Sequence, residues 1–184
     1  MHVLYHVFPL APNLPNCYIF NSEMYKEYLR EAYEFAARNS TDKSTQNGAI
    51  LVNGEGTVVA WGANRFPRGV VESPERLERP AKYLYVVHAE HSAVLDAAKR
   101  GIKTDGLTMY GTWVACNDCA KSIIDSGIVK VVGHKKTMDA APERWLEPIR
   151  IAKQMFMEAG VVYEMWDGDI GEVEVLFNGE MFRP

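Results

Sequence analysis

Residues 107–133 read LTMYGTWVACNDCAKSIIDSGIVKVVG, and this stretch decides the fold. It opens with an apolar run at 107–112 that favours a strand. A helical pattern then starts near Asn117 and ends at Gly127, and a second apolar run follows at 129–133. A strand, a helix and a strand in this order predict an α/β fold.

The same alternation extends in both directions along the chain. Downstream, a helix is predicted from Pro142 to Gly160, followed by a strand at 161–166. Upstream, a helix is predicted at about 88–100, ending at Gly101. The sequence therefore predicts repeated helix–strand units.

The segment before these units carries a helix and a hairpin. Residues 21–40 place apolar side chains on one helical stripe. Two short apolar runs around Gly54-Glu55-Gly56 predict a hairpin over 48–63, and the charged, proline-containing segment 65–82 is interpreted as a loop. We predict a three-layer α/β/α sandwich with a mixed sheet of roughly five strands.

The chain is predicted to have three parts: an extended arm at 1–21, one domain at 22–166 and an acidic tail at 167–184. The arm is apolar but lacks Lys and Arg and is interrupted by prolines, so it fits neither a signal peptide nor a membrane span. The tail is interpreted as a partner surface or a frayed end.

Composition limits the class of protein. The chain has 184 residues, 47% of them hydrophobic, and a formal net charge of −4. This charge argues against a protein that grips polymeric nucleic acid. Three cysteines, two of them in C-x-x-C spacing, favour a metal or redox pair in a reducing compartment, so we expect a cytoplasmic protein.

Two half-motifs predict a metal site. His88 stands two residues before Glu90, and Cys116 stands three before Cys119, each pair at the start of a predicted helix. If the two helix starts converge, one imidazole and two thiolates hold one Zn²⁺ per chain. The fourth position is then left for water, as in catalytic zinc sites, with Glu90 beside it. The alternatives are a structural site closed by a fourth ligand, or a buried polar pair. The candidate fourth ligands are His91 and His134.

These half-motifs follow the order H-x-E…C-x-x-C of zinc deaminases. Over about residues 22–165 the chain resembles the zinc-dependent cytidine and deoxycytidylate deaminase family, and most of all its deoxycytidylate (dCMP) deaminases. The segments KYLYVVHAE and CAKSIIDSGIVKVV are also similar to that family. The resemblance implies a cytidine deaminase-like fold and hydrolysis of dCMP to dUMP and ammonia, in pyrimidine nucleotide metabolism of a cell or a phage.

The resemblance also implies roles for individual residues. Glu90 takes a proton from water at the zinc, passes it to the pyrimidine N3 and later protonates the departing amine. Asn64 bonds the sugar or the base edge. The backbone N–H of Ala89 meets the base O2, and the carbonyl of Val114 meets the exocyclic amine.

A nucleotide substrate also needs a phosphate anchor. Four basic residues are candidates, and the sequence does not choose among them: Arg65 and Arg68 in the charged segment, and Lys99 and Arg100 at the end of the predicted helix 88–100, from which they could reach a neighbouring subunit's site. Trp113 is interpreted as a core residue, with base stacking as the alternative.

The chain departs from the family pattern at several places. Ala115 replaces the proline before the first cysteine, and Ser92 stands where the family often has asparagine. Residues 62–65 read Gly-Ala-Asn-Arg in place of the Gly-Tyr-Asn-Gly of regulated members, which leaves control by dCTP and dTTP open. A second zinc, found in some relatives, is not expected. The only other residues that could bind it lack a recognisable spacing: His2, His6 and Cys17.

Other substrates remain open from sequence. The same chemistry could act on a 5-substituted dCMP, dCTP, cytidine, or another nucleoside or free base. A tRNA adenosine deaminase and a non-catalytic zinc-binding module are further alternatives. The resemblance implies a homo-oligomer, a hexamer or a dimer, with a small-molecule deoxynucleotide substrate and no membrane partner.

Overall fold

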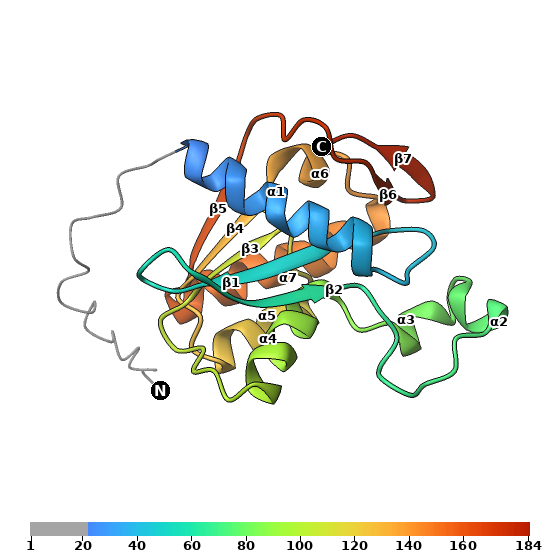
Figure 1. The fold of residues 1–184 in the computed structure, drawn as a ribbon, viewed down its shortest axis with the longest axis horizontal. Helices are drawn as coiled ribbons and strands as arrows, with labels where there is room; N and C mark the ends of the chain where they lie inside the picture. Colours follow the sequence, from blue (N-terminus) through green and yellow to red (C-terminus); the bar gives the residue numbers. More distant parts are fainter. Residues whose placement is uncertain (1–21) are drawn as a thin grey trace, which may run out of the picture.

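The structure, a computed structural model, describes residues 22–184 and is built on a mixed sheet in the order β2-β1-β3-β4-β5 (Figure 1). β1 (Gly48–Val52) is antiparallel to both β2 (Val58–Ala63) and β3 (Thr108–Gly111). β4 (Lys130–His134) and β5 (Val162–Trp166) extend the sheet parallel to β3. The predicted mixed five-stranded sheet is confirmed.

Helices cover both faces of this sheet (Figure 1). α1 (Ser22–Asn39) packs on one face, and the apolar side chains predicted for its stripe are all buried. α4 (Ala89–Lys99), α5 (Asn117–Asp125) and α7 (Glu143–Ala159) pack on the other face. The predicted three-layer α/β/α sandwich is therefore confirmed.

Strand alternation divides the core in two. In β1, Ala49 and Leu51 belong to the cluster under α4, α5 and α7, whereas Ile50 and Val52 belong to the cluster under α1. Successive side chains of a strand point to opposite faces, so a strand covered on both faces reads as an uninterrupted apolar run. This accounts for the continuous apolar segments in the sequence.

The segment at 65–82, expected to be a loop, contains α2 (Pro74–Leu77) and leads directly into α3 (Lys82–Tyr85). Helices of one turn are too short to show an apolar period, so the sequence pattern missed them. Lys82 is buried, and its Nζ lies 2.8 Å from Oδ2 of the buried Asp42. This ion pair ties α3 to the segment that precedes β1.

The acidic tail folds back on the domain. After β5, the buried side chain of Ile170 joins the core under α1, and β6 (Val175–Phe177) pairs with β7 (Glu180–Phe182) as a hairpin. α6 (Lys135–Asp139), a short helix after β4, packs close to this region (Figure 1). The tail thus contributes apolar side chains to the core, while the division of the chain into arm, domain and tail remains a prediction.

Residues 1–21 lie outside the described residues, and with them the arm, His2, His6 and Cys17, for which predictions were made. Within residues 22–184, no helix combines the length and the apolar character that crossing a bilayer requires.

Candidate metal centre

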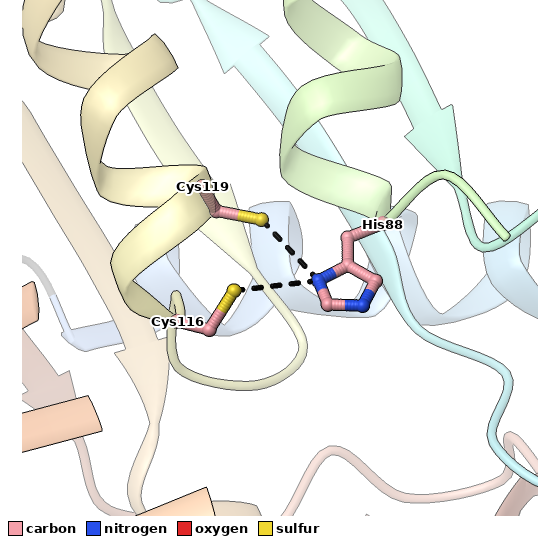
Figure 2. Close-up of side chains that lie close together, drawn as sticks. All are labelled: His88, Cys116 and Cys119. Carbon is pink, nitrogen blue, oxygen red and sulfur yellow. Dashed lines mark hydrogen bonds between the residues drawn. The ribbon is translucent and has the colours of Figure 1, made fainter. Parts of the chain in front are cut away.

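Two helices begin at the same edge of the sheet and bring the half-motifs together. His88 is the N-cap residue of α4, and Cys116 is the N-cap residue of α5. Cys119 lies in the first turn of α5, three residues on, so it shares a helix face with Cys116. The side chains of His88, Cys116 and Cys119 point toward one another (Figure 2).

The ligand atoms have the spacing of a zinc site. His88 Nδ1 lies 3.5 Å from the Sγ atom of Cys116 and 3.5 Å from that of Cys119. A tetrahedral zinc with ordinary Zn–S and Zn–N bond lengths holds nitrogen and sulfur about 3.6 Å apart. The donor set and its geometry therefore fit one zinc ion per chain.

Residues 22–184 bring no fourth protein ligand to this centre. Among residues 22–184, the group of three or more His, Cys, Asp and Glu ligand atoms that all lie within 4.8 Å of one another is that of His88, Cys116 and Cys119. His91 is exposed, and the His134 ring is held elsewhere by the Tyr33 hydroxyl and the Gly168 carbonyl. Three protein ligands leave one tetrahedral position for a small molecule, the arrangement of catalytic zinc.

The two thiols differ in acidity. The hydrogen bond from Cys119, and then that from His88, lowers the pKa of the Cys116 thiol to about 4. The same bond to Cys116, together with burial, raises the pKa of Cys119. Both sulfurs also lie at the positive end of the α5 dipole, which stabilises thiolate. The site is thus prepared to bind a soft divalent cation.

Glu90 lies beside the sulfurs, in the first turn of α4. Its side chain is buried, and its Oε2 lies 3.5 Å from Cys119 Sγ. Burial raises the pKa of this carboxyl, with the nearby His88 acting in the opposite direction. A carboxyl whose pKa is moved toward neutrality is suited to accept and return a proton.

The end of β2 sets the position of α4. A Cβ atom on Gly62 would come within 2.1 Å of the Ala89 carbonyl oxygen, so only glycine permits this approach. Asn64 Oδ1 accepts a hydrogen bond from Ala89 N–H at 3.0 Å, and Asn64 Nδ2 donates to the Thr45 carbonyl at 3.0 Å. The Ala89 N–H expected at the base O2 is therefore engaged by Asn64 in this structure.

A pocket opens over the metal centre and includes the predicted residues Asn64, Glu90 and Val114 in its lining. It contains about 620 Å³ of space, part of it open to solvent, which is in the range of small-molecule sites. Its walls carry three aromatic rings in edge contact: Trp113 with Trp145 at 5.7 Å and with Phe177 at 5.4 Å.

Trp113 therefore lines the pocket in addition to packing. Its buried Nε1 has no hydrogen-bond acceptor within the part of the chain that the structure describes. A buried indole N–H without an acceptor is a donor available to a ligand.

The basic residues expected to anchor phosphate lie elsewhere. Arg65, Arg68 and Lys99 line a second cavity, which shares no lining residue with the pocket at His88. Arg65 Nε donates to Ser92 Oγ at 2.9 Å, so these two departures from the family pattern contact each other. Arg100 pairs with Asp96 on α4.

Other cations line the metal pocket instead: Arg79, Lys82 and Arg144. The sequence interpretation missed Arg79 and Lys82 because the segment 65–82 was treated as a loop. One signal was available for Arg144. It falls in the first turn of the helix after the strand at 129–133, and ligands of α/β sheets bind at the carboxyl ends of the strands.

The sequence matches a known protein family and several known proteins. Residues 22–135 match the family model described as the cytidine and deoxycytidylate deaminase zinc-binding region. An uncharacterised deaminase of Aliivibrio fischeri is 38% identical over 140 residues, covering 76% of this chain and 91% of that protein. The deoxycytidylate deaminase of Mus musculus is 30% identical over 164 residues, and the match covers 86% of this chain and 88% of the mouse protein.

A solved structure has the same fold. The dCMP deaminase of the cyanophage S-TIM5, in complex with dCMP and dUMP, superposes with a TM-score of 0.62 at 28% identity. The match covers 79% of this chain and 98% of that chain. The resemblance predicted from sequence is confirmed.

Proposed function

The chain belongs to the cytidine and deoxycytidylate deaminase family, and we propose that it hydrolyses dCMP to dUMP with release of ammonia. One observation carries this proposal. An imidazole and two thiols, from segments remote in the sequence, meet with zinc spacing next to a buried carboxyl that lines a pocket. The dCMP and dUMP bound to the cyanophage relative support the same substrate here.

His88, Cys116 and Cys119 hold the zinc in this proposal. When bound, a zinc ion of this kind is a Lewis acid that lowers the pKa of a coordinated water. The first turns of α4 and α5 fix the three side chains in place, and aromatic rings form part of the pocket wall around them.

Glu90 moves the protons. It accepts one from the attacking water and delivers it to N3 of the pyrimidine. It then accepts the second proton of that water from the hydroxyl group now on C4 and transfers it to the amine, so that the C4 carbonyl forms as ammonia leaves. Burial supports this role because it raises the pKa of the carboxyl and so favours its protonated form relative to an exposed glutamate.

Three pocket residues are proposed to hold the base. The Val114 carbonyl accepts from the exocyclic amine, and the Trp113 indole N–H donates to the ligand. Asn64 acts by fixing the Ala89 peptide, because its Oδ1 accepts a hydrogen bond from Ala89 N–H. When a pyrimidine binds, this N–H either bonds Asn64 Oδ1 and the base O2 together or turns from Asn64 to the base O2.

An ammonia-release assay on the zinc-loaded protein tests the function. The substrates to compare are dCMP, dCTP, deoxycytidine and cytosine. We expect dCMP to give the highest kcat/KM. Turnover restricted to a nucleoside or a free base would overturn the choice of substrate.

The Glu90→Gln variant separates an enzyme from a zinc module used only for binding. We expect it to retain one zinc per chain and the wild-type circular dichroism spectrum. Its kcat should fall by about 10²- to 10⁴-fold, the range for loss of a general acid–base group. A variant as active as the wild type would remove Glu90 from the mechanism.

Assembly and compartment are further proposals. We propose a homo-oligomer, supported by the exposed apolar side chains of Val71 and Leu84, which are 69% and 85% exposed on the segment around α2 and α3. Sedimentation velocity measures the assembly directly. The unbridged Cys116 and Cys119 suit a reducing compartment such as the cytoplasm.

A further inference from the structure

We propose that Arg79 and Arg144 form the phosphate subsite of the pocket, and that Asn178, from the C-terminal hairpin, positions both guanidinium groups. This inference rests on the proposed function, because it identifies the part of the site that distinguishes a nucleotide monophosphate from a nucleoside. All three residues line the pocket that contains His88 and Glu90.

The two arginines meet at one oxygen atom. Arg79 Nη2 donates to Asn178 Oδ1 at 3.1 Å, and Arg144 Nη2 donates to the same oxygen at 2.8 Å. Arg79 comes from the segment before α3, and Arg144 from the first turn of α7. Segments far apart in the sequence thus place two positive charges side by side.

Neither guanidinium is neutralised. Among residues 22–184, neither Arg79 nor Arg144 forms an ion pair, and their other side-chain partners are the hydroxyl groups of Ser44 and Tyr83. Within the described part of the chain, the pocket lining contains two acidic residues, Asp42 and Glu90, and Asp42 is already paired with Lys82. Two like charges held together without a counterion favour the binding of a dianion.

The tail holds Asn178 in place. Asn178 N–H donates to Thr45 Oγ1 at 3.2 Å, and the next residue, Gly179, donates its N–H to the Ser44 carbonyl at 2.7 Å. Gln46 and Leu176 form two more hydrogen bonds between these segments. Four bonds therefore fix the hairpin to the segment before β1, and Asn178 faces the pocket from a rigid support.

A phosphate monoester matches this arrangement. Guanidinium groups bind phosphate through paired, charge-assisted N–H···O bonds, and each retains further donors when one is given to Asn178. The arginines are exposed at the mouth of the pocket, whereas Glu90 is buried. A nucleotide would then place its base at the metal centre and its phosphate at the solvent side.

Steady-state kinetics of Arg79→Gln and Arg144→Gln, with dCMP and with deoxycytidine, test the subsite. Loss of one charge-assisted contact should lower kcat/KM for dCMP by about 10- to 100-fold, mostly through KM. The kcat/KM for deoxycytidine should not change. Equal losses on both substrates, or no loss on dCMP, would overturn the subsite.

Arg150→Gln is the matched control for Arg144→Gln. Arg150 lies on α7 as well, is exposed, and pairs with Glu147 outside the pocket. The Arg150→Gln variant removes the same charge from the same helix, so its kcat/KM should equal that of the wild type for both dCMP and deoxycytidine. An equal rise of the KM for dCMP in this variant would show that the net charge of the protein, and not a subsite at Arg144, governs this KM.

Two substitutions of Asn178 test its positioning role. Asn178 has a left-handed backbone, φ 53°, so Asn178→Gly keeps the turn and removes only the amide. Asn178→Asp is isosteric but places a carboxylate between the arginines, where it competes with phosphate. We expect KM for dCMP to rise in the glycine variant and to rise further in the aspartate variant. An aspartate variant that binds dCMP as well as the wild type would refute the assignment.

Binding of inorganic phosphate separates this inference from the proposed function. Isothermal calorimetry on the zinc-loaded protein should detect phosphate binding that weakens in Arg79→Gln and Arg144→Gln. If the wild type released no ammonia from dCMP, the function would fail while this titration still tested the subsite. If dCMP were a substrate but both variants bound phosphate like the wild type, the subsite alone would fail.

Discussion

The side-chain Oδ1 of Asn64 accepts a hydrogen bond from the backbone N–H of Ala89 at 3.0 Å. This bond joins the end of β2 to the first residue of α4, directly between His88, the proposed zinc ligand, and Glu90. The geometry of the metal centre thus depends on a residue that is not itself a ligand.

Asn64→Ala should destabilise the protein and lower its activity. The substitution leaves two buried backbone groups, Ala89 N–H and the Thr45 carbonyl, without their partner. Such groups cost about 1–3 kcal/mol when unsatisfied. Urea unfolding measures the loss. Asn39→Ala, on the exposed end of α1, is the control and should stay within about 0.5 kcal/mol of the wild type.

Gly62→Ala should displace α4. Its new Cβ would lie 2.1 Å from the Ala89 carbonyl oxygen and 2.3 Å from Ala93 N, both of them backbone atoms. Overpacking of this kind costs about 1–3 kcal/mol or more, and it should reduce both zinc affinity and kcat. Gly54→Ala is the control, because a Cβ there meets no atom within 4 Å. Equal unfolding midpoints for the two variants would contradict this account of α4.

Removal of zinc should abolish turnover and lower the melting temperature. A ligand that binds the folded chain alone stabilises it according to its concentration and affinity. Incubation with a chelator, followed by dialysis, gives the protein to be measured by calorimetry and by ammonia release. Added zinc should restore both properties in the wild type. In Cys119→Ser, which lacks one sulfur ligand, much more zinc should be required; full recovery at wild-type zinc concentrations would count against Cys119 as a ligand.

The buried His134 should make stability depend on pH. Burial lowers its pKa below the ordinary value of 6.5, although the bond to the Gly168 carbonyl acts in the opposite direction. The folded chain therefore binds this proton less tightly than the unfolded chain. The uncharged His134 ring therefore stabilises the folded chain fully above pH 6.5, and this stabilisation is lost as the pH falls below 6.5.

Urea midpoints of wild type and His134→Gln, both zinc-loaded, measured between about pH 5 and pH 7.5, isolate this residue. The difference between the two proteins should shrink as the pH falls, because only the wild type loses the His134 contribution. A difference that stays constant with pH would exclude His134 as the titrating group.

The layered fold was predictable because its long elements carry strong periodic patterns. α1, α4, α5 and α7 each bury one stripe, and glycine marks the end of several of them, as Gly160 does with its left-handed φ of 72°. The metal centre was predictable for a local reason. Each half-motif sits at a helix start, where side-chain direction is constrained by covalent spacing.

The mouth of the pocket was not predicted, because it depends on how irregular segments fold back. Arg79 reaches the pocket only through the one-turn helices, and Asn178 only through the tail hairpin. A signal for that hairpin does exist in the sequence. Asn178-Gly179 lies between two short apolar runs, and Asn-Gly is a strong hairpin turn.

Anomalous diffraction at the zinc absorption edge, from crystals of the zinc-loaded protein with dUMP, tests the central claim most directly. We predict one strong peak per chain at the starts of α4 and α5, coordinated by His88 Nδ1 and the sulfurs of Cys116 and Cys119. The remaining coordination position should face Glu90 and the pyrimidine and be filled by solvent or ligand. A fourth protein ligand on that ion, or zinc bound away from these three side chains, would contradict the account.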